Sequence, residues 1–135
     1  SILTKAGDGD YGVWNLHYKT TSNGFRFEIY DSSSTEKNIF ESTPSTALNN
    51  WYHIVGVYDE NTMKLFIDGV LSNSRSLSDP IQTNDLPLRI GKQHYWDNIY
   101  SYWDGLIDEV KIYNRALSAD EVLQNYNAQK GRFGL

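Results

Sequence analysis

Apolar and polar residues alternate along most of this chain, and the alternation predicts short β-strands. In the clearest case, Trp14, Leu16 and Tyr18 occupy every second position. A period of two is typical of a strand with one buried face. Asn-Gly and Asp-Gly pairs separate several of the runs and favour tight hairpins. The strands expected on this basis are residues 2–5, 11–18, 25–30, 38–42, 51–58, 63–68, 70–71, 88–91 and 106–113.

Three segments depart from simple alternation. Residues 51–58 are almost continuously apolar or aromatic, which predicts a central strand that is covered on both faces. Residues 72–87 are rich in Ser, Asn, Asp and Pro, which predicts a loop. Residues 94–104 carry Trp and Tyr without clear periodicity, and this too predicts a loop.

The last predicted strand leads into a helix. Ile107, Val110 and Ile112 are β-branched and suit a core strand. Beyond them, Ser118 has the place of an N-cap, and Glu121 three residues later can complete a capping box.

The helix that follows is short and amphipathic. Leu117 and Val122 can form a hydrophobic staple across its N-terminus. We expect it to pack on the outside of a sheet and to fray from Lys130 onward.

Composition supports one mostly β domain. The chain has 135 residues, enough for a hydrophobic core, and 14% of them are aromatic. Many short strands with regular turns indicate an antiparallel sandwich. The net charge is −5 and the basic residues are scattered, so nucleic acid is not an expected partner. No cysteine is present, and no apolar run is long enough for membrane insertion.

Four motifs together resemble a known family. They are the Trp-Tyr-His start of residues 51–58, the Ile-Asp-Gly-Val end of residues 63–70, residues 88–91, and residues 104–118. The chain resembles the laminin G-like group of concanavalin A-like lectin/glucanase domains over nearly its whole length. The resemblance implies an all-β, antiparallel jelly-roll sandwich with one concave sheet, to which this sequence adds one short C-terminal helix.

The beginning of the chain departs from that family pattern. We expect residues 1–135 to form a single laminin G-like domain that lacks the family's first strands, and to be a module of a larger extracellular or cell-surface protein. A missing strand would leave an exposed edge, and an exposed edge invites pairing with a second chain. A homodimer through this edge is therefore expected.

The aromatic segment is the first candidate binding site. Tyr and Trp rings stack on the apolar faces of sugars, while neighbouring polar groups bond to hydroxyls. Alternatively, these rings cover the core beneath a long loop. Trp14, Tyr18 and Tyr52 could also line the concave sheet, although core packing is favoured for them. The candidate residues are His94, Tyr95, Trp96, Asp97, Asn98, Tyr100 and Tyr102.

Calcium is the second candidate ligand. Ca²⁺ takes several oxygen ligands, and Asp104 and Asp108 lie near a glycine turn and within the last predicted strand. The family resemblance implies that Asp108 could hold a structural calcium ion. Alternatively, Asp108 faces solvent or bonds to the backbone. Asp8 and Asp10 are further candidates, for which ordinary turn chemistry is favoured.

Catalysis has little support in the sequence. Glycoside hydrolysis needs two carboxylates on either side of the scissile bond, and adjacent residues such as Asp108 and Glu109 point to opposite faces of a strand. The leading hypothesis is a non-catalytic module that binds carbohydrate or a cell-surface glycan. A structural or protein-adhesion module without a sugar site is the alternative, and a glycoside hydrolase domain is third.

Overall fold

The computed structural model of the protein describes residues 1–6, 12–20, 24–40, 49–78, 80–94 and 100–135. The expected mostly β architecture with one C-terminal helix is confirmed. The elements are β1 (Leu3–Lys5), β2 (Trp14–Lys19), β3 (Gly24–Tyr30), β4 (Glu36–Phe40), β5 (Ile54–Tyr58), β6 (Thr62–Ile67), β7 (Val70–Ser76), β8 (Leu88–Ile90), β9 (Lys92–His94), β10 (Tyr100–Tyr102) and α1 (Ala119–Phe133).

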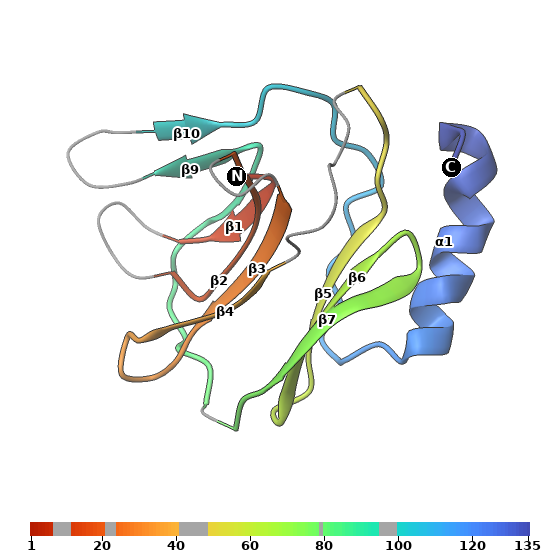
Figure 1. The fold of residues 1–135 in the computed structure, drawn as a ribbon. Coiled ribbons are helices and arrows are strands. Elements are labelled where there is room, and N and C mark those ends of the chain that lie inside the picture. The colour runs from red at the N-terminus through yellow and green to blue at the C-terminus, as the bar shows by residue number, and fades with distance from the viewer. Residues whose placement is uncertain (7–11, 21–23, 41–48, 79, 95–99) are drawn as a thin grey trace.

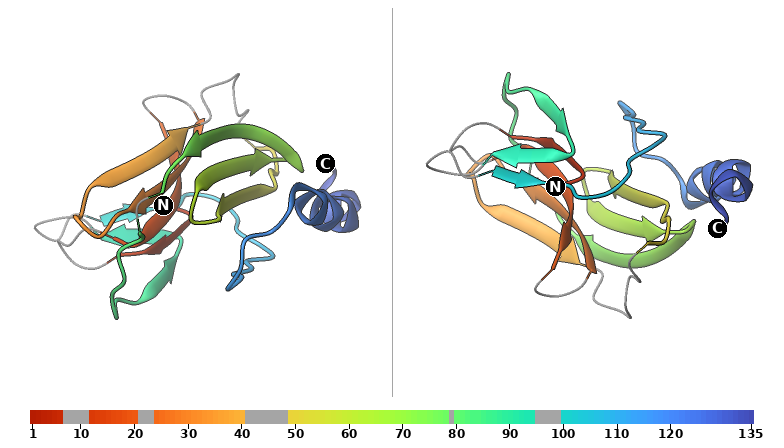
Figure 2. Two further views of the ribbon diagram at one scale, coloured as in Figure 1. Left: turned by 90° about the horizontal axis from the view of Figure 1, so that it is seen from below. Right: turned by 90° about the horizontal axis from the view of Figure 1, so that it is seen from above.

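Two antiparallel sheets face each other (Figure 1). One has five strands in the order β4-β3-β2-β1-β8, and the other has three in the order β5-β6-β7. β9 and β10 form a separate hairpin. α1 lies beside the three-stranded sheet, on the side away from the five-stranded sheet (Figures 1 and 2). Within the described residues, no helix combines the length and the apolar character that crossing a bilayer requires.

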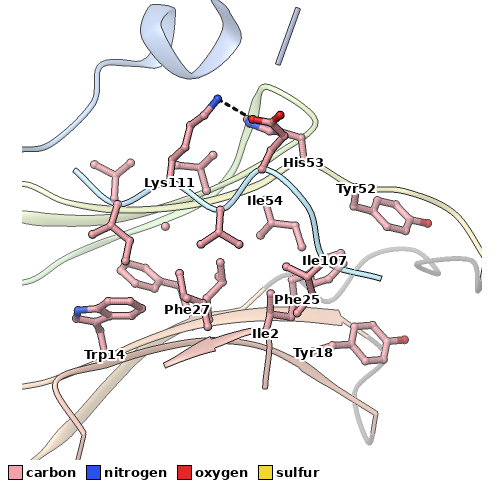
Figure 3. Close-up of a pocket in the computed structure, with 18 of the residues that line it drawn as sticks. Ile2, Trp14, Tyr18, Phe25, Phe27, Tyr52, His53, Ile54, Ile107 and Lys111 are labelled. Atoms are coloured by element: carbon pink, nitrogen blue, oxygen red, sulfur yellow. Dashed lines mark ion pairs between the residues drawn. The ribbon is translucent and has the colours of Figure 1, made fainter. Parts of the chain in front are cut away.

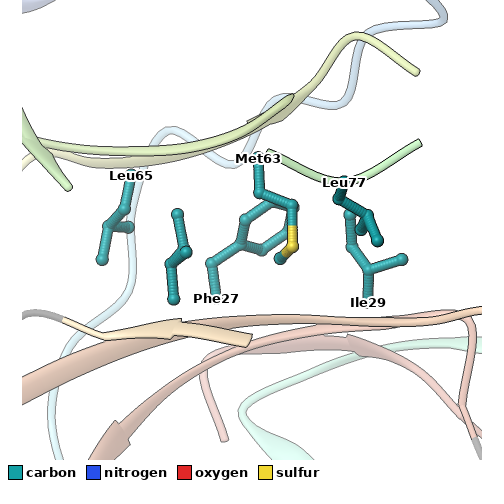
Figure 4. Close-up of a cluster of buried hydrophobic side chains, with 6 residues drawn as sticks. Phe27, Ile29, Met63, Leu65 and Leu77 are labelled. Carbon is teal, nitrogen blue, oxygen red and sulfur yellow. The ribbon is translucent and has the colours of Figure 1, made fainter. Parts of the chain in front are cut away.

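Strand alternation fills the space between the sheets with apolar side chains. Register places Leu3, Leu16, Phe27 and Ile39 in one row across the five-stranded sheet. The buried cluster between the sheets is Phe27, Ile29, Ile39, Met63, Leu65 and Leu77 (Figure 4). The predicted hairpin of β2 and β3 is confirmed, because the two strands pair in antiparallel register.

The predicted helix start is confirmed in detail. The Ser118 side chain accepts a hydrogen bond from the backbone N–H of Glu121, and the Glu121 side chain accepts from that of Ser118. Leu117 and Val122 are buried together against the three-stranded sheet. The predicted fraying is wrong, because the helix continues to Phe133 and ends at Gly134, whose φ of 71° provides a left-handed cap.

The predicted strand over residues 106–113 is wrong. The segment has no strand structure, and Leu106 and Ile112 expose 76% and 55% of their surface. Within the described residues, no neighbouring strand forms backbone hydrogen bonds with it. Glu109 also has a φ of 52°, which interrupts an extended backbone. Its sequence suits a strand, but the described chain supplies no partner for one.

Two further strand predictions need correction. The strand expected over residues 51–58 begins at Ile54, and β5 lies at the edge of the described sheet rather than at its centre. The strand expected at residues 70–71 continues to Ser76 in β7, where a loop was predicted. Its polar residues still fit a strand, because most of β7 is exposed at the opposite edge of the sheet.

Gly56 lets the two sheets approach each other. A Cβ atom at this position would lie 2.6 Å from the Phe27 ring, which is itself buried in the core. We expect Gly56→Ala to lower the free energy of unfolding by about 1–3 kcal/mol, because the ring must shift within a packed core. Urea denaturation measures this. Gly131→Ala is the matched control, because a Cβ there meets nothing within 4 Å and a gain in helix propensity is expected.

Candidate functional site

The β9–β10 hairpin presents an exposed aromatic ring. Its register pairs Tyr102 with Lys92 and Ser101 with Gln93. Tyr102 exposes 65% of its surface, and the Lys92 ammonium lies 5.9 Å from the ring centroid. Gln93, the next residue along, is buried. One side of the hairpin is therefore anchored, while Tyr102 faces solvent.

The structure places the predicted aromatic site on this hairpin in part. The backbones of His94 and Tyr100 pair with each other at one end of the β9–β10 ladder. Tyr102 lies two residues further along β10. The predicted contacts Tyr95, Trp96, Asp97 and Asn98 lie outside the described residues, as do the side chains of His94 and Tyr100.

A buried row of polar side chains crosses the other face of the five-stranded sheet. Register aligns Thr4, Asn15 and Glu28, and these residues expose 0%, 1% and 3% of their surface. They occupy the face opposite the apolar row that fills the core. Buried polar groups need hydrogen-bond partners, and this row obtains one of them from the hairpin.

Asn15 is the centre of the resulting network. Its Oδ1 accepts from the Ser1 hydroxyl at 2.7 Å. Its Nδ2 donates to Glu28 Oε2 and to Gln93 Oε1, each at 3.1 Å, and contacts His17 Nδ1 at 2.7 Å. The contact with Gln93 joins two residues that are 78 positions apart and fixes the hairpin to the sheet.

The same network determines the state of His17. Asn15 Nδ2 carries two hydrogens for three neighbouring acceptors, so His17 Nδ1 shares this donor with the Glu28 and Gln93 oxygens. His17 Nε2 then faces Glu28 Oε1 at 3.4 Å. Burial, followed by the positive charge of Arg26, lowers the pKa of His17 from 6.5 to about 4. His17 is therefore neutral at pH 7.

Glu28 is a buried carboxylate with a cationic partner. Arg26 Nε lies 2.9 Å from Glu28 Oε1, and Arg26 also pairs with Glu36. Burial raises the pKa of Glu28 above its ordinary value, and the Arg26 charge opposes that shift. The side chains of His17 and Glu28 expose only 13% and 4% of their surface, so they offer little surface to a substrate.

Sequence reasoning missed this network. Alternation placed Asn15, His17 and Glu28 on the polar face of their strands, which is where they lie. Nothing local indicated that this face is covered, because Gln93 reaches it from a distant hairpin. The available signal was two neighbouring polar pairs in one hairpin, Asn15 opposite Glu28 and His17 opposite Arg26.

The two predicted calcium ligands have different surroundings. Asp108 is exposed, and its Oδ1 accepts from the Glu109 backbone at 2.7 Å while its Oδ2 pairs with Arg132 at 2.9 Å. Asp104 is also exposed. Among the residues that the structure describes, no three acidic, His or Cys side chains gather closely enough to hold a metal. Asp8 and Asp10 lie outside the described residues, and the calcium site stays a prediction.

Three other aromatic residues line a cleft between the sheets (Figure 3). Trp14 packs against the core cluster. Tyr18 and Tyr52 each make an edge-to-face contact with Phe25, at 5.5 and 5.4 Å between ring centroids. Core packing, the favoured alternative in the sequence, thus describes Trp14 best, while the two tyrosines extend the core toward the cleft.

Comparison with known proteins places the chain in a family. A laminin G family model, described as the Concanavalin A-like lectin/glucanases superfamily, matches residues 1–123. The chain belongs to this superfamily. No protein with a curated description matches it in sequence.

Several solved structures share the fold. The binding domain of Paraclostridial Mosquitocidal Protein 1 is 19% identical with a TM-score of 0.69, and the match covers 94% of this chain and 31% of that one. The receptor binding domain of botulinum neurotoxin D is 17% identical with a TM-score of 0.63, covering 95% and 32%. An S-layer domain-containing protein from Clostridium thermocellum is 23% identical with a TM-score of 0.53, covering 84% and 63%.

The matched chains are longer than this one. This superfamily member spans about a third of each toxin domain and under two thirds of the S-layer chain. Two of these structures are a binding domain and a receptor binding domain, and the third belongs to an S-layer domain-containing protein.

Proposed function

We propose that this chain is a non-catalytic carbohydrate-binding module of a larger secreted or cell-surface protein, with its sugar site on the β9–β10 hairpin. The observation that carries the proposal is the solvent-facing ring of Tyr102 on a buried polar base. An exposed tyrosine offers a flat apolar face for a sugar ring and a hydroxyl for hydrogen bonding. The adjacent Lys92 adds a donor and a positive charge.

Anchoring makes this ring a better binding surface than an ordinary exposed side chain. A rigid aromatic group loses little conformational entropy when it binds, so more of the contact energy appears as affinity. The Asn15–Gln93 bond restrains the strand opposite Tyr102. The binding-domain structures that share the fold support the general role.

A non-catalytic role is favoured by how the acidic groups are placed. Glu28, with its raised pKa, could resemble a general acid, but it exposes only 3% of its surface. A glycosidase needs two carboxyl groups that reach the substrate. Asp59 pairs with Lys64 and Asp108 with Arg132, so these carboxylates have structural partners instead.

A glycan array with the purified chain tests the proposal. We expect binding to one class of glycan, and we expect Tyr102→Ala to weaken it by about tenfold or more, because the stacking surface is lost. Tyr113→Ala is the matched control, because Tyr113 is also an exposed tyrosine but lies outside the hairpin. Thermal unfolding should be nearly unchanged in both variants.

Three outcomes separate the alternatives. Equal losses in the two variants would remove the hairpin from the site. If the folded chain binds no glycan, a structural or protein-adhesion module replaces the lectin assignment. Repeating the array in a chelator tests the calcium prediction, since loss of binding there would show that a cation is needed for the site.

A further inference from the structure

The β9–β10 hairpin is joined to the five-stranded sheet at its base. There the Gly91 N–H donates to the Ile2 carbonyl, and the Gly91 carbonyl accepts from the Trp103 N–H, both at 2.9 Å. Further along the hairpin, which lies beside β1 (Figure 1), the buried Gln93 accepts from Asn15 Nδ2 at 3.1 Å. Beyond Gly91, this side-chain bond joins the hairpin to the polar face of the sheet.

Asn15 offers the same amide nitrogen to His17. Its Nδ2 lies 2.7 Å from His17 Nδ1 and 3.1 Å from Glu28 Oε2. A carboxylate oxygen only accepts, and the Ser1 hydroxyl donates to Asn15 Oδ1 on the other side, so the orientation of the amide is fixed. The His17 ring and the Gln93 side chain therefore share one donor group, through which a change at His17 reaches the hairpin.

A protonated His17 does not fit this arrangement. A neutral imidazole can accept at Nδ1, whereas an imidazolium carries a hydrogen on both ring nitrogens. Its Nδ1–H would face the hydrogens of Asn15 Nδ2 across 2.7 Å, which places two donors together without an acceptor. If the Asn15 amide turns over, its Oδ1 faces Gln93 Oε1 and their bond is lost. If the ring moves instead, it displaces the groups around it, because only 13% of its side chain is exposed.

The charges around His17 also oppose a proton on its ring. The positive groups are Arg26 on β3, Lys19 on β2 and the amino group of Ser1. Burial first, and then these charges, lower the pKa of His17 to about 4, while a hydrogen bond with the uncharged Gln93 side chain of the hairpin acts in the opposite direction.

Glu28 is the acidic group that faces the His17 ring, with 3.4 Å between Nε2 and Oε1. The same oxygen lies 2.9 Å from Arg26 Nε, so its charge is already shared. Burial raises the pKa of Glu28 above its ordinary value of 4.5. On acidification Glu28 therefore loses its negative charge before His17 gains a positive one, and the ring is left among cations.

We propose that the β9–β10 hairpin is a pH-operated gate, in which proton uptake by His17 withdraws the Asn15 amide from Gln93, frees the hairpin from the sheet and switches off the glycan site at Tyr102. The control of glycan binding rests on the proposed function, whereas the release of the hairpin does not. The gate is closed at neutral pH, and it is reversible because no covalent bond changes.

The direction of the pH dependence follows from linkage. An open hairpin exposes the imidazole to water and restores its ordinary affinity for a proton, so the closed state has the lower His17 pKa. The open state then binds more protons between pH 6.5 and pH 4, and acid favours it. The limit is about a tenfold change in the closed–open equilibrium per pH unit.

Hydrogen exchange of the purified chain tests the gate without any glycan. Trp103 bonds to Gly91, and ladder bonds recur at every second pair, so the amides of Gln93 and Ser101 belong to the next bonded pair. Their protection, measured relative to the intrinsic exchange rate at each pH, should fall about tenfold or more from pH 6.5 to pH 4. The amides of Met63 and Leu65 in β6 should lose less protection, and a return to pH 6.5 should restore the hairpin.

Two histidine variants show which group operates the gate. His17→Gln should abolish the selective response of the hairpin, because a Gln amide can accept from Asn15 and does not titrate. His53→Gln is the matched control. Burial lowers the pKa of His53 as well, but its ring packs against Tyr126 on α1, away from the hairpin. This variant should keep the response of the parent chain.

Repeating the glycan array at pH 6.5 and at pH 4 tests the control of binding. The parent chain should bind about tenfold more weakly or worse at pH 4, and His17→Gln should lose much less. If no glycan binds at pH 6.5, the proposed function fails, and hydrogen exchange still decides whether the hairpin opens.

Three results would overturn the gate. Equal loss of protection in the hairpin and in β6 would mean that acid unfolds the whole domain. An unchanged response in His17→Gln would assign proton uptake to another group. Glycan binding that is equal at both pH values while the hairpin opens would show that the hairpin does not control the site.

Discussion

Replacing Asn15 with alanine is expected to lower the free energy of unfolding by about 3 kcal/mol or more. The side chain exposes 1% of its surface and contacts four other residues. The substitution leaves the Ser1 hydroxyl, the Gln93 carbonyl oxygen and one Glu28 oxygen without this partner. Each buried polar group that loses its bond costs about 1–3 kcal/mol. Urea denaturation followed by tryptophan fluorescence measures the change.

The same substitution should loosen the hairpin before the whole domain unfolds. Gln93 joins β9 to the sheet through Asn15, so its loss removes the contact that restrains the hairpin base. Exchange of the Gln93 and Ser101 amides should accelerate more than exchange of the Met63 and Leu65 amides in β6. Glycan affinity should fall as well, although Tyr102 itself is unchanged.

Asn127→Ala provides the matched control for Asn15. Asn127 is an exposed residue of α1, so its replacement should change stability by less than about 0.5 kcal/mol. If Asn15→Ala lowers the free energy of unfolding by no more than Asn127→Ala does, water replaces the lost hydrogen bonds and the network does not anchor the hairpin.

The parts of the fold that depend on local chemistry were predictable. The Ser118 cap needs only Glu121 three residues away, and both hydrogen bonds are present. The alternation of Trp14, Leu16 and Phe27 identified a strand face that does point into the cleft and core. These features follow from residues close in sequence, and tertiary contacts reinforce them.

The errors concern features that depend on distant partners. Residues 106–113 have a strand-like sequence, but a strand exists only when another pairs with it, and Glu109 bends toward α1 instead. β5 was expected at a sheet centre because it is apolar on both faces. Its faces are in fact covered by the core on one side and by α1 on the other, and it forms one edge of the sheet among the described strands.

The candidate site was predictable only in outline. Tyr102 belongs to the aromatic segment that the sequence singled out, and its side chain is exposed. The network beneath it could not be predicted, because Asn15 and Gln93 are 78 positions apart and neither belongs to a recognisable motif. Alternation assigns a polar residue to a face but does not say what covers that face.

Acidification from pH 6.5 to pH 4 is expected to destabilise the domain through His17. The pKa of His17 is about 4 in the folded chain, against 6.5 ordinarily, so within this window the unfolded chain binds a proton that the folded chain excludes. Stability therefore falls as the pH falls. The full window corresponds to about 3 kcal/mol at about 1.4 kcal/mol per pH unit.

Glu28 acts in the opposite direction. Its pKa is raised in the folded chain, so its ionisation costs stability as the pH rises, and protonation near its folded pKa relieves part of that cost. The measured fall should therefore be smaller than the contribution of His17 alone. Glu28→Gln should steepen the fall in stability on acidification, because the variant lacks the carboxyl group whose protonation opposes that fall.

His17→Gln isolates the histidine, because an amide can still accept from Asn15 and donate toward Glu28 without titrating in this range. Urea unfolding of the two proteins at pH 4 and at pH 6.5 should show that the variant loses less stability on acidification. Some dependence should remain, since burial also lowers the pKa of His53. If the variant and the parent lose equal stability, His17 is already solvated in the folded chain, and the hairpin base is more open than its contacts indicate.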